Sequence, residues 1–186
     1  KQFTYALLDE RVPPTPMPSR EDARAELARR YFISHGPAQL RDFVWWSGLT
    51  TAEARAGLER VRHRLAEMEA DGRRYWLAPS ARTTGRPGRV AYLLPPYDEY
   101  LIAYKDRGAA LDPALWQPVG SRISFVAPVV LDGRVVGGWK RTADEARVSI
   151  TLDLPRRLSR EDARLVDDAA RRYGTFLGLD VARLRR

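Results

Sequence analysis

The sequence predicts an α+β protein in which a helix-turn-helix and a β-hairpin come first and a β-rich region with a terminal helix follows. Residues 38–46 have a helical pattern and lead through Ser47-Gly48-Leu49 into a second, capped helix, which is the outline of a helix-turn-helix. Two strand-like runs, 65–70 and 73–78, flank Asp71-Gly72, the strongest short-range signal of a hairpin. Together these elements are the outline of a winged helix.

The N-terminal segment, residues 1–18, is expected to form a strand followed by a proline-rich connector, because proline fixes φ and excludes helix. The next helix is predicted to begin after Ser19, whose side chain caps it, with Asp22 in the capping-box position three residues later. Gly36 is expected to end this helix as a C′ glycine, and Pro37 blocks its continuation.

The third helix is predicted to begin at Thr50, where Glu53 completes a capping box. In a winged helix this element enters the major groove, and its exposed side chains touch bases and phosphates. The alternative is a solvated face on which Glu and Arg pair with one another, as Arg55 with Glu59 would. On or near the outer face we expect Thr51, Arg55, Arg60 and Arg62.

The hairpin that follows the third helix is expected to carry Arg73 and Arg74 at its tip, where the wing would touch phosphates. Residues 79–89 are expected to be a flexible basic linker. Trp45-Trp46, in the preceding helix, is expected to fill the core, and a base-stacking role is the alternative.

The second half is predicted to contain a strand at 90–94 and, at 95–107, a turn followed by an aromatic-rich helix or loop. Three further strand-like runs, two of them joined by the hairpin turn Asp132-Gly133, indicate a small antiparallel β-barrel-like region. Ser159 is expected to cap a last helix, which Gly178 ends. The three runs are 123–131, 134–141 and 146–153.

The expected organisation is therefore a strand and proline-rich connector at 1–18, a winged-helix domain at 19–89, and a β-rich region with a terminal helix at 90–186. A hydrophobic content of 44% can supply a core for these parts. Because the chain starts at Lys1 and not at Met, we expect it to be a piece of a longer protein or a trimmed chain.

The composition is basic, with 32 Lys and Arg against 24 Asp and Glu and a net charge of +8. Such a balance is typical of a domain that binds a polyanion. A GC-rich genome is the alternative source of so many arginines beside three lysines. The absence of cysteine excludes disulfides, zinc ribbons and thiol catalysis, and no apolar run reaches the roughly 18 residues of a membrane span. With two histidines, no metal and no cofactor are expected.

Segments spread over nearly the whole chain resemble the bacterial winged-helix DNA-binding family that includes the AlkZ and YcaQ type DNA glycosylases, which excise alkylated purines and unhook interstrand crosslinks. The segments that carry the resemblance are Phe3-Thr4-Tyr5-Ala6-Leu7-Leu8-Asp9-Glu10, Ala28-Arg29-Arg30-Tyr31-Phe32, Ser34-His35-Gly36-Pro37-Ala38, Phe43-Val44-Trp45-Trp46-Ser47-Gly48-Leu49, Leu93-Leu94-Pro95-Pro96-Tyr97-Asp98-Glu99-Tyr100-Leu101, Tyr104-Lys105-Asp106-Arg107, Val130-Leu131-Asp132-Gly133-Arg134-Val135-Val136-Gly137, Arg172-Tyr173-Gly174 and Phe176-Leu177-Gly178.

The resemblance implies tandem winged helices followed by a β-barrel-like region, of which this chain would carry the later winged helix and the β region. It also implies that the hairpin 123–141, with Arg134, lies near DNA. The glycosylases of this family carry their catalytic residues in an early Gln-x-Gln or Gln-x-Asp motif. Gln2, Gln39 and Gln117 do not form one, so no catalytic residue is assigned. The expected DNA contacts are Thr51, Arg55, Arg60, Arg62, Arg73, Arg74 and Arg134.

The adjacent acids Asp98 and Glu99 do not form an obvious catalytic pair, because neighbouring side chains diverge on a helix and on a strand. We expect caps or local salt bridges with Lys105, Arg107 or Arg134. The alternative is that both acids line a cleft that faces DNA.

The function that these observations favour is that of a non-catalytic, DNA-binding part of a DNA-repair glycosylase-like protein. Double-stranded DNA is the expected partner, and the protein is expected to be a cytoplasmic monomer. Three alternatives stay open: a glycosylase whose catalytic motif lies upstream of Lys1, a protein-interaction module and a domain of the transcription-regulator type. In the interaction module the interface would include Tyr97, Tyr100 and Tyr104.

Overall fold

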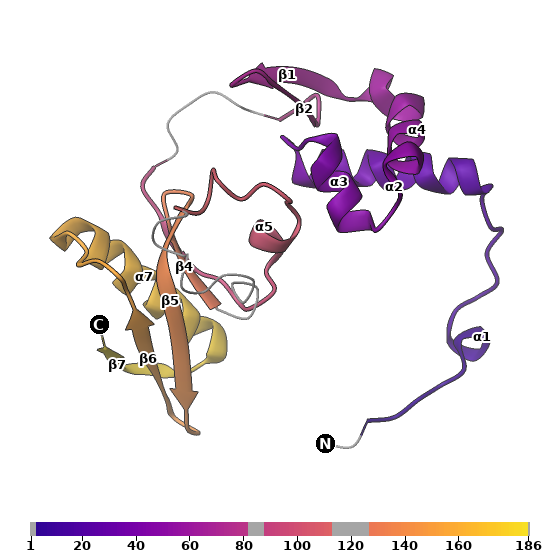
Figure 1. Ribbon diagram of the computed structural model, residues 1–186. Helices are drawn as coiled ribbons and strands as arrows, with labels where there is room; N and C mark the ends of the chain where they lie inside the picture. The colour runs from indigo at the N-terminus through magenta and orange to yellow at the C-terminus, as the bar shows by residue number, and fades with distance from the viewer. Residues whose placement is uncertain (1–2, 82–87, 113–126, 186) are drawn as a thin grey trace. The chain divides into compact units, whose positions relative to one another are not determined.

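The structure, a computed structural model, describes residues 3–81, 88–112 and 127–185 (Figure 1). The fold is mixed α+β and divides into two compact units. The first comprises Lys1–Leu40 and Leu49–Pro79, and the second comprises Arg41–Gly48 and Ser80–Arg186. Helix α3, Leu40–Ser47, therefore belongs almost entirely to the second unit.

The N-terminal segment contains a short helix, α1 at Leu8–Arg11, and no strand within residues 3–18. The prediction of a strand in this segment is therefore wrong. A strand needs a neighbour to satisfy its backbone groups, and none pairs with this segment among the described residues. Phe3 and Tyr5 are more than nine-tenths exposed, so these residues contribute nothing to the core.

Helices α2, Arg20–His35, and α4, Thr51–Val61, form the body of the first unit and pack against each other. Both begin as predicted. The Ser19 side chain accepts from the Asp22 amide, and Thr50 and Glu53 form a complete capping box. Buried side chains from both helices form the core between them: Ala28, Tyr31, Phe32, Ala54, Leu58 and Val61.

Gly36 does follow α2, but it does not adopt the left-handed conformation expected of a C′ glycine. Its φ is −66°. Glycine is needed there for space instead, because an added Cβ would lie 2.6 Å from the carbonyl oxygen of Trp76 and overlap Leu77 and Phe32 as well. The backbone of strand β2 thus passes directly over the end of the helix.

A hairpin completes the first unit, as predicted. After the short 3-10 helix η1, Arg62–Arg64, strands β1, Ala66–Ala70, and β2, Arg73–Leu77, pair antiparallel. Asp71 and Gly72 have φ of 50° and 67°, the positive values that a type I′ turn requires. Trp76 of β2 also exchanges backbone hydrogen bonds with Ala38, which ties the hairpin to the segment after α2.

The second unit is built on a five-stranded sheet of order β3-β4-β5-β6-β7. Its strands are β3 Ala91–Leu93, β4 Ala127–Leu131, β5 Arg134–Ala143, β6 Arg147–Asp153 and β7 Asp180–Arg185, and its helices besides α3 are α5 Glu99–Ile102 and α7 Arg160–Leu177. Asp132 and Gly133 form the predicted hairpin turn. Ser159 caps α7, and Gly178 ends it with a φ of 68°.

The prediction of an entirely antiparallel region is wrong, because the sheet has a further strand after the terminal helix. This strand was not predicted from the sequence. Strand β7 pairs parallel to β6. Parallel neighbours need a crossover, and α7 supplies it by carrying the chain back across the sheet between β6 and β7 (Figure 1). In this linear order β3 and β7 are the edges, so the described strands form an open, mixed sheet.

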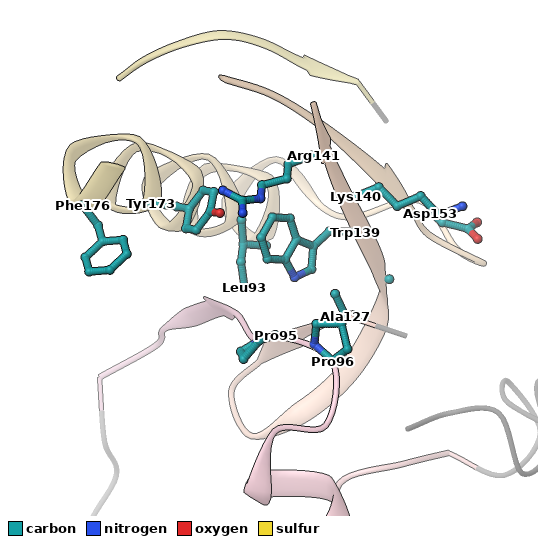
Figure 2. Close-up of a pocket in the computed structure, with 11 residues that line it drawn as sticks. Leu93, Pro95, Pro96, Ala127, Trp139, Lys140, Arg141, Asp153, Tyr173 and Phe176 are labelled. Atoms are coloured by element: carbon teal, nitrogen blue, oxygen red, sulfur yellow. The ribbon is translucent and has the colours of Figure 1, made fainter. Parts of the chain in front are cut away.

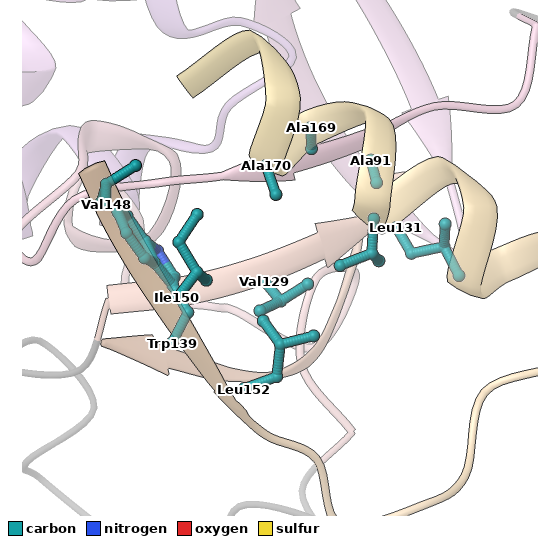
Figure 3. Close-up of a cluster of buried hydrophobic side chains, with 10 residues drawn as sticks. Ala91, Val129, Leu131, Trp139, Val148, Ile150, Leu152, Ala169 and Ala170 are labelled. Atoms are coloured by element: carbon teal, nitrogen blue, oxygen red, sulfur yellow. The ribbon is translucent and has the colours of Figure 1, made fainter. Parts of the chain in front are cut away.

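The core of the second unit lies between α7 and one face of this sheet (Figure 3). The helix contributes its small apolar residues, and the strands contribute aliphatic side chains and one tryptophan. The buried residues of the cluster are Ala91, Val129, Leu131, Trp139, Val148, Ile150, Leu152, Val166, Ala169 and Ala170. Small helix residues against branched strand residues allow the helix to approach the sheet closely.

Candidate nucleic-acid interface

The exposed face of α4 carries Thr51 and Arg55, which are four residues apart and therefore neighbours on the helix surface. Arg55 has no ion pair among the described residues. Arg60, by contrast, pairs with two acids at the start of α2, 2.9 Å from Glu21 and 2.7 Å from Asp22. The expected contact residues of α4 are thus not equivalent, because only Arg55 presents an uncompensated charge.

Glu67 on β1 forms ion pairs with two more of the predicted contact residues, Arg62 and Arg74. Arg62 lies 2.9 Å and Arg74 2.8 Å from its carboxylate, and Arg62 is also 3.9 Å from Glu59. Arg73 is exposed at the hairpin. The pairing of Arg with Glu that the sequence left as an alternative is therefore present at Arg60, Arg62 and Arg74, although the Glu59 partner is Arg62 rather than Arg55.

The positive charge is distributed unevenly between the units. The first unit has 12 Lys and Arg against 10 Asp and Glu, whereas the second has 20 against 14. Most of the net charge therefore lies in the second unit, in which Arg134 is the only expected DNA contact. Exposed cations of this unit without an ion pair among the described residues include Arg134, Lys140, Arg141, Arg156, Arg157, Arg160 and Arg164.

Three of these arginines surround a cavity at the start of α7. Arg156, Arg157 and Arg160 line a volume of about 720 Å³ together with Leu154, Leu158, Ser159 and Ala163. The cavity is a basic surface beside a helix N-terminus, where the backbone dipole also favours negative charge. Glu161 and Asp162 of the first turn oppose this in part, although both pair with Arg89.

The segment 95–107 is held to α3 by polar contacts within the second unit. The indole N–H of Trp45 donates to the Ile102 carbonyl at 3.0 Å, and that of Trp46 donates to the Glu99 carboxylate at 3.2 Å. The Lys105 ammonium lies 4.8 Å from the centre of the Trp45 ring. Trp45 is 48% exposed, so it is not the core residue that the sequence led us to expect.

The two adjacent acids of this segment have separate structural partners. Asp98 caps α5 by accepting from the Tyr100 amide at 2.9 Å, as the capping interpretation predicts. Glu99 accepts from Trp46. Tyr100 donates its hydroxyl hydrogen to the Gly133 carbonyl. Burial raises the pKa of Tyr100, while the positive charge of Arg134 opposes that rise.

A second cavity, of about 840 Å³, opens beside the sheet of the second unit, and we call it the aromatic pocket (Figure 2). Its aromatic residues are Trp139 on β5 and Tyr173 and Phe176 on α7. Charged residues at its edge are Lys140, Arg141 and Asp153, and the rest of the lining is Leu93, Pro95, Pro96, Ala127 and Gly138. Sequence reasoning missed this site, although Trp139-Lys140-Arg141 on a strand was a visible signal.

Within the described ranges no three His, Asp or Glu side chains gather in a way that could hold a metal ion. His35 stacks on Tyr31, with ring centres 4.9 Å apart. In the same ranges no helix has both the length and the apolarity to cross a membrane.

A structure of the Streptomyces sahachiroi DNA glycosylase AlkZ is similar, with a TM-score of 0.67 and 20% identity over 92% of this chain and 47% of that one. The chain thus spans about half the length of that protein. A search of curated proteins found no match. The family described as "DNA glycosylase AlkZ-like" matches residues 1–176, and the chain therefore belongs to the AlkZ-like DNA glycosylase family.

Proposed function

We propose that this chain is a non-catalytic, DNA-binding part of an AlkZ-like DNA glycosylase that acts on alkylated or crosslinked DNA. The observation that carries the proposal is the charge of the second unit, 20 Lys and Arg against 14 Asp and Glu, in a member of a DNA glycosylase family. Exposed cations of this unit such as Arg134, Arg156 and Arg157 are available to phosphates because they have no ion pair among the described residues.

In this proposal α2, α4 and the β1–β2 hairpin of the first unit belong to a winged helix, and α4 lies in the major groove of double-stranded DNA. Thr51 and Arg55 face the DNA, and Arg73 at the hairpin contacts a phosphate. Arg60, Arg62 and Arg74 contribute less than the sequence predicts, since each is committed to a carboxylate. The protein acts as a monomer in the cytoplasm.

Fluorescence anisotropy with a labelled duplex tests the main claim. We expect binding at about 50 mM salt, with the logarithm of the affinity falling by roughly 0.9 per logarithmic unit of salt for each phosphate neutralised. Arg156→Ala together with Arg157→Ala should reduce that slope by about two and weaken binding to every sequence alike. Failure to bind a duplex at about 50 mM salt contradicts the proposal. If the chain instead binds a protein with an affinity that does not depend on salt, the alternative of a protein-interaction module is supported.

The role of α4 is tested by a matched pair of variants on that helix. Arg55→Ala should weaken duplex binding, whereas Arg60→Ala should weaken it much less because Arg60 is held by Glu21 and Asp22. Equal affinities of Arg55→Ala and the unaltered chain would remove α4 from the interface and leave the second unit as the contact surface.

The non-catalytic claim is tested by base release. The chain lacks the Gln-x-Gln or Gln-x-Asp motif that its family resemblance would require for catalysis. We therefore expect no release of alkylated purines from DNA by this chain, even at concentrations that saturate the DNA. Release of a modified base would show that these residues contain a catalytic group.

A further inference from the structure

The wall of the aromatic pocket is rigid and oriented. The indole N–H of Trp139 donates to the Leu94 carbonyl at 2.8 Å, which fixes the rotation of the ring. Tyr173 meets this ring edge to face, with centres 5.1 Å apart and planes at 73°. The guanidinium of Arg141 lies 5.6 Å from the centre of the Tyr173 ring. The aromatic surface formed by Trp139 and Tyr173 is therefore bordered by the positive charge of Arg141.

Strand and helix periodicity explain why these groups converge. Alternate residues of a strand share a face, so Trp139 and Arg141 of β5 lie on one side, while Lys140 is directed away from Tyr173 (Figure 2). Residues three apart on a helix are neighbours, so Tyr173 and Phe176 of α7 lie side by side. Phe176 is 83% exposed, which is unusual for a large apolar side chain beside a pocket.

The polar groups at the edge of the pocket are separated. Arg141 lies beside Tyr173, whereas the side chains of Lys140 and Asp153 lie together on the side away from Tyr173 (Figure 2). Asp153 follows Leu152, the partner of Trp139 in the sheet, so it projects from the opposite face. A ligand that fits the side with Trp139 and Tyr173 is planar and hydrophobic and carries an anion at the end nearest Arg141.

We propose that the aromatic pocket receives one unstacked nucleotide of a DNA strand. The base packs on Tyr173 and Phe176 beside the largely buried Trp139, and its phosphate pairs with Arg141. Aromatic rings combined with nearby cations are the general means by which proteins hold unpaired nucleotides. A volume of about 840 Å³ lies within the usual range for small-ligand sites and exceeds that of one nucleotide.

This inference rests on the proposed function, because it assumes that the chain reaches DNA, and it adds that the chain distinguishes unpaired from paired nucleotides. A base inside a duplex is already stacked on both faces and must leave the stack to enter the pocket. A nucleotide in a bulge enters at a lower cost. The pocket therefore predicts tighter binding to DNA with an unpaired nucleotide than to the same fully paired duplex.

The test compares two duplexes of the same sequence, one fully paired and one with a single bulged 2-aminopurine. We expect the bulged duplex to bind about fivefold or more tightly, and the fluorescence of the 2-aminopurine to fall as the base stacks. Phe176→Ala should abolish this preference without unfolding the protein, since Phe176 is largely exposed. Arg141→Ala should reduce the preference as well.

Matched controls come from residues outside the pocket. Tyr92→Ala removes an exposed aromatic ring beside Leu93 on β3, and Arg147→Ala removes an exposed cation of β6, so neither should change the ratio of the two affinities. Equal binding of both duplexes by the unaltered chain, or a preference that survives Phe176→Ala, overturns the inference and leaves the proposed function standing. Absence of binding to either duplex instead contradicts the proposed function itself.

Discussion

Asp42 of α3 accepts a hydrogen bond at 3.0 Å from the backbone N–H of Lys105, which lies far along the chain after α5. The same carboxylate oxygen accepts from the Asp106 amide at 3.2 Å. Asp42 is only 3% exposed and is the buried charged residue of the described core. It therefore anchors the segment that follows α5 to α3 through two hydrogen bonds.

Asp42→Ala should destabilise the protein by about 2 kcal/mol, because two backbone N–H groups lose their acceptor in a buried place. Asp42→Asn keeps one acceptor oxygen and should cost clearly less. Urea unfolding followed by tryptophan fluorescence measures both values. Identical unfolding midpoints for the two variants and the unaltered protein would show that these hydrogen bonds are dispensable.

Gly36→Ala should destabilise the first unit by roughly 3 kcal/mol, since the added methyl group meets backbone atoms of Leu77, Trp76 and Phe32 that cannot move independently. Gly72→Ala is the matched control. Gly72 has open space around it and a φ of 67°, so only the cost of the left-handed conformation applies, about 1 kcal/mol. Thermal unfolding of the two variants compares them, and a smaller loss for Gly36→Ala would contradict the close approach of β2.

Hydrogen bonds from Arg29 and then Arg30 lower the pKa of Glu26 to about 2. A carboxyl whose pKa is lowered on folding stabilises the native state above its unfolded pKa, and that contribution disappears as the pH falls from about 4.5 to about 2. NMR titration of the Glu26 carboxyl carbon measures the pKa. In Arg29→Ala this pKa should rise towards the usual value of 4.5 for a glutamate, and an unchanged titration would exclude the pair as its cause.

Arg89 pairs with Asp132, Glu161 and Asp162, so it connects β3 to the β4–β5 turn and to the start of α7. The pKa of Asp132 is lowered first by the hydrogen bond from the Val90 amide and then by Arg89. In Arg89→Gln the pKa of Asp132 should therefore rise only part of the way to its usual value. NMR titration of that carboxyl tests this order, and a full return of the pKa to its usual value would show that the arginine dominates.

Local signals predicted the ends of the elements well. Ser19, Thr50 and Ser159 cap their helices as expected, and both Asp-Gly turns form hairpins. Each of these outcomes depends on residues within four positions of one another, so the physical cause is present in a short stretch of sequence. Family membership was likewise recognisable from segments spread along the chain, and the family match over residues 1–176 confirms it.

The site was less predictable. Helical periodicity placed Arg55 and Arg60 on the outer face of α4. It could not show that Arg60 forms ion pairs with Glu21 and Asp22 of another helix. The aromatic pocket was not predicted either, because Trp139 and Tyr173 are 34 positions apart in the sequence. When two residues in contact are distant in sequence, the local pattern around neither of them indicates the contact.

The sequence by itself determined where helices and turns begin and end, the positive charge and the family. Only the tertiary structure decided that Gly36 serves close packing, that β7 runs parallel to β6, and which arginines remain unpaired. The reason is physical: caps and turns are closed by hydrogen bonds over a few residues, whereas crossovers, ion pairs and pockets depend on which distant segments the chain brings together.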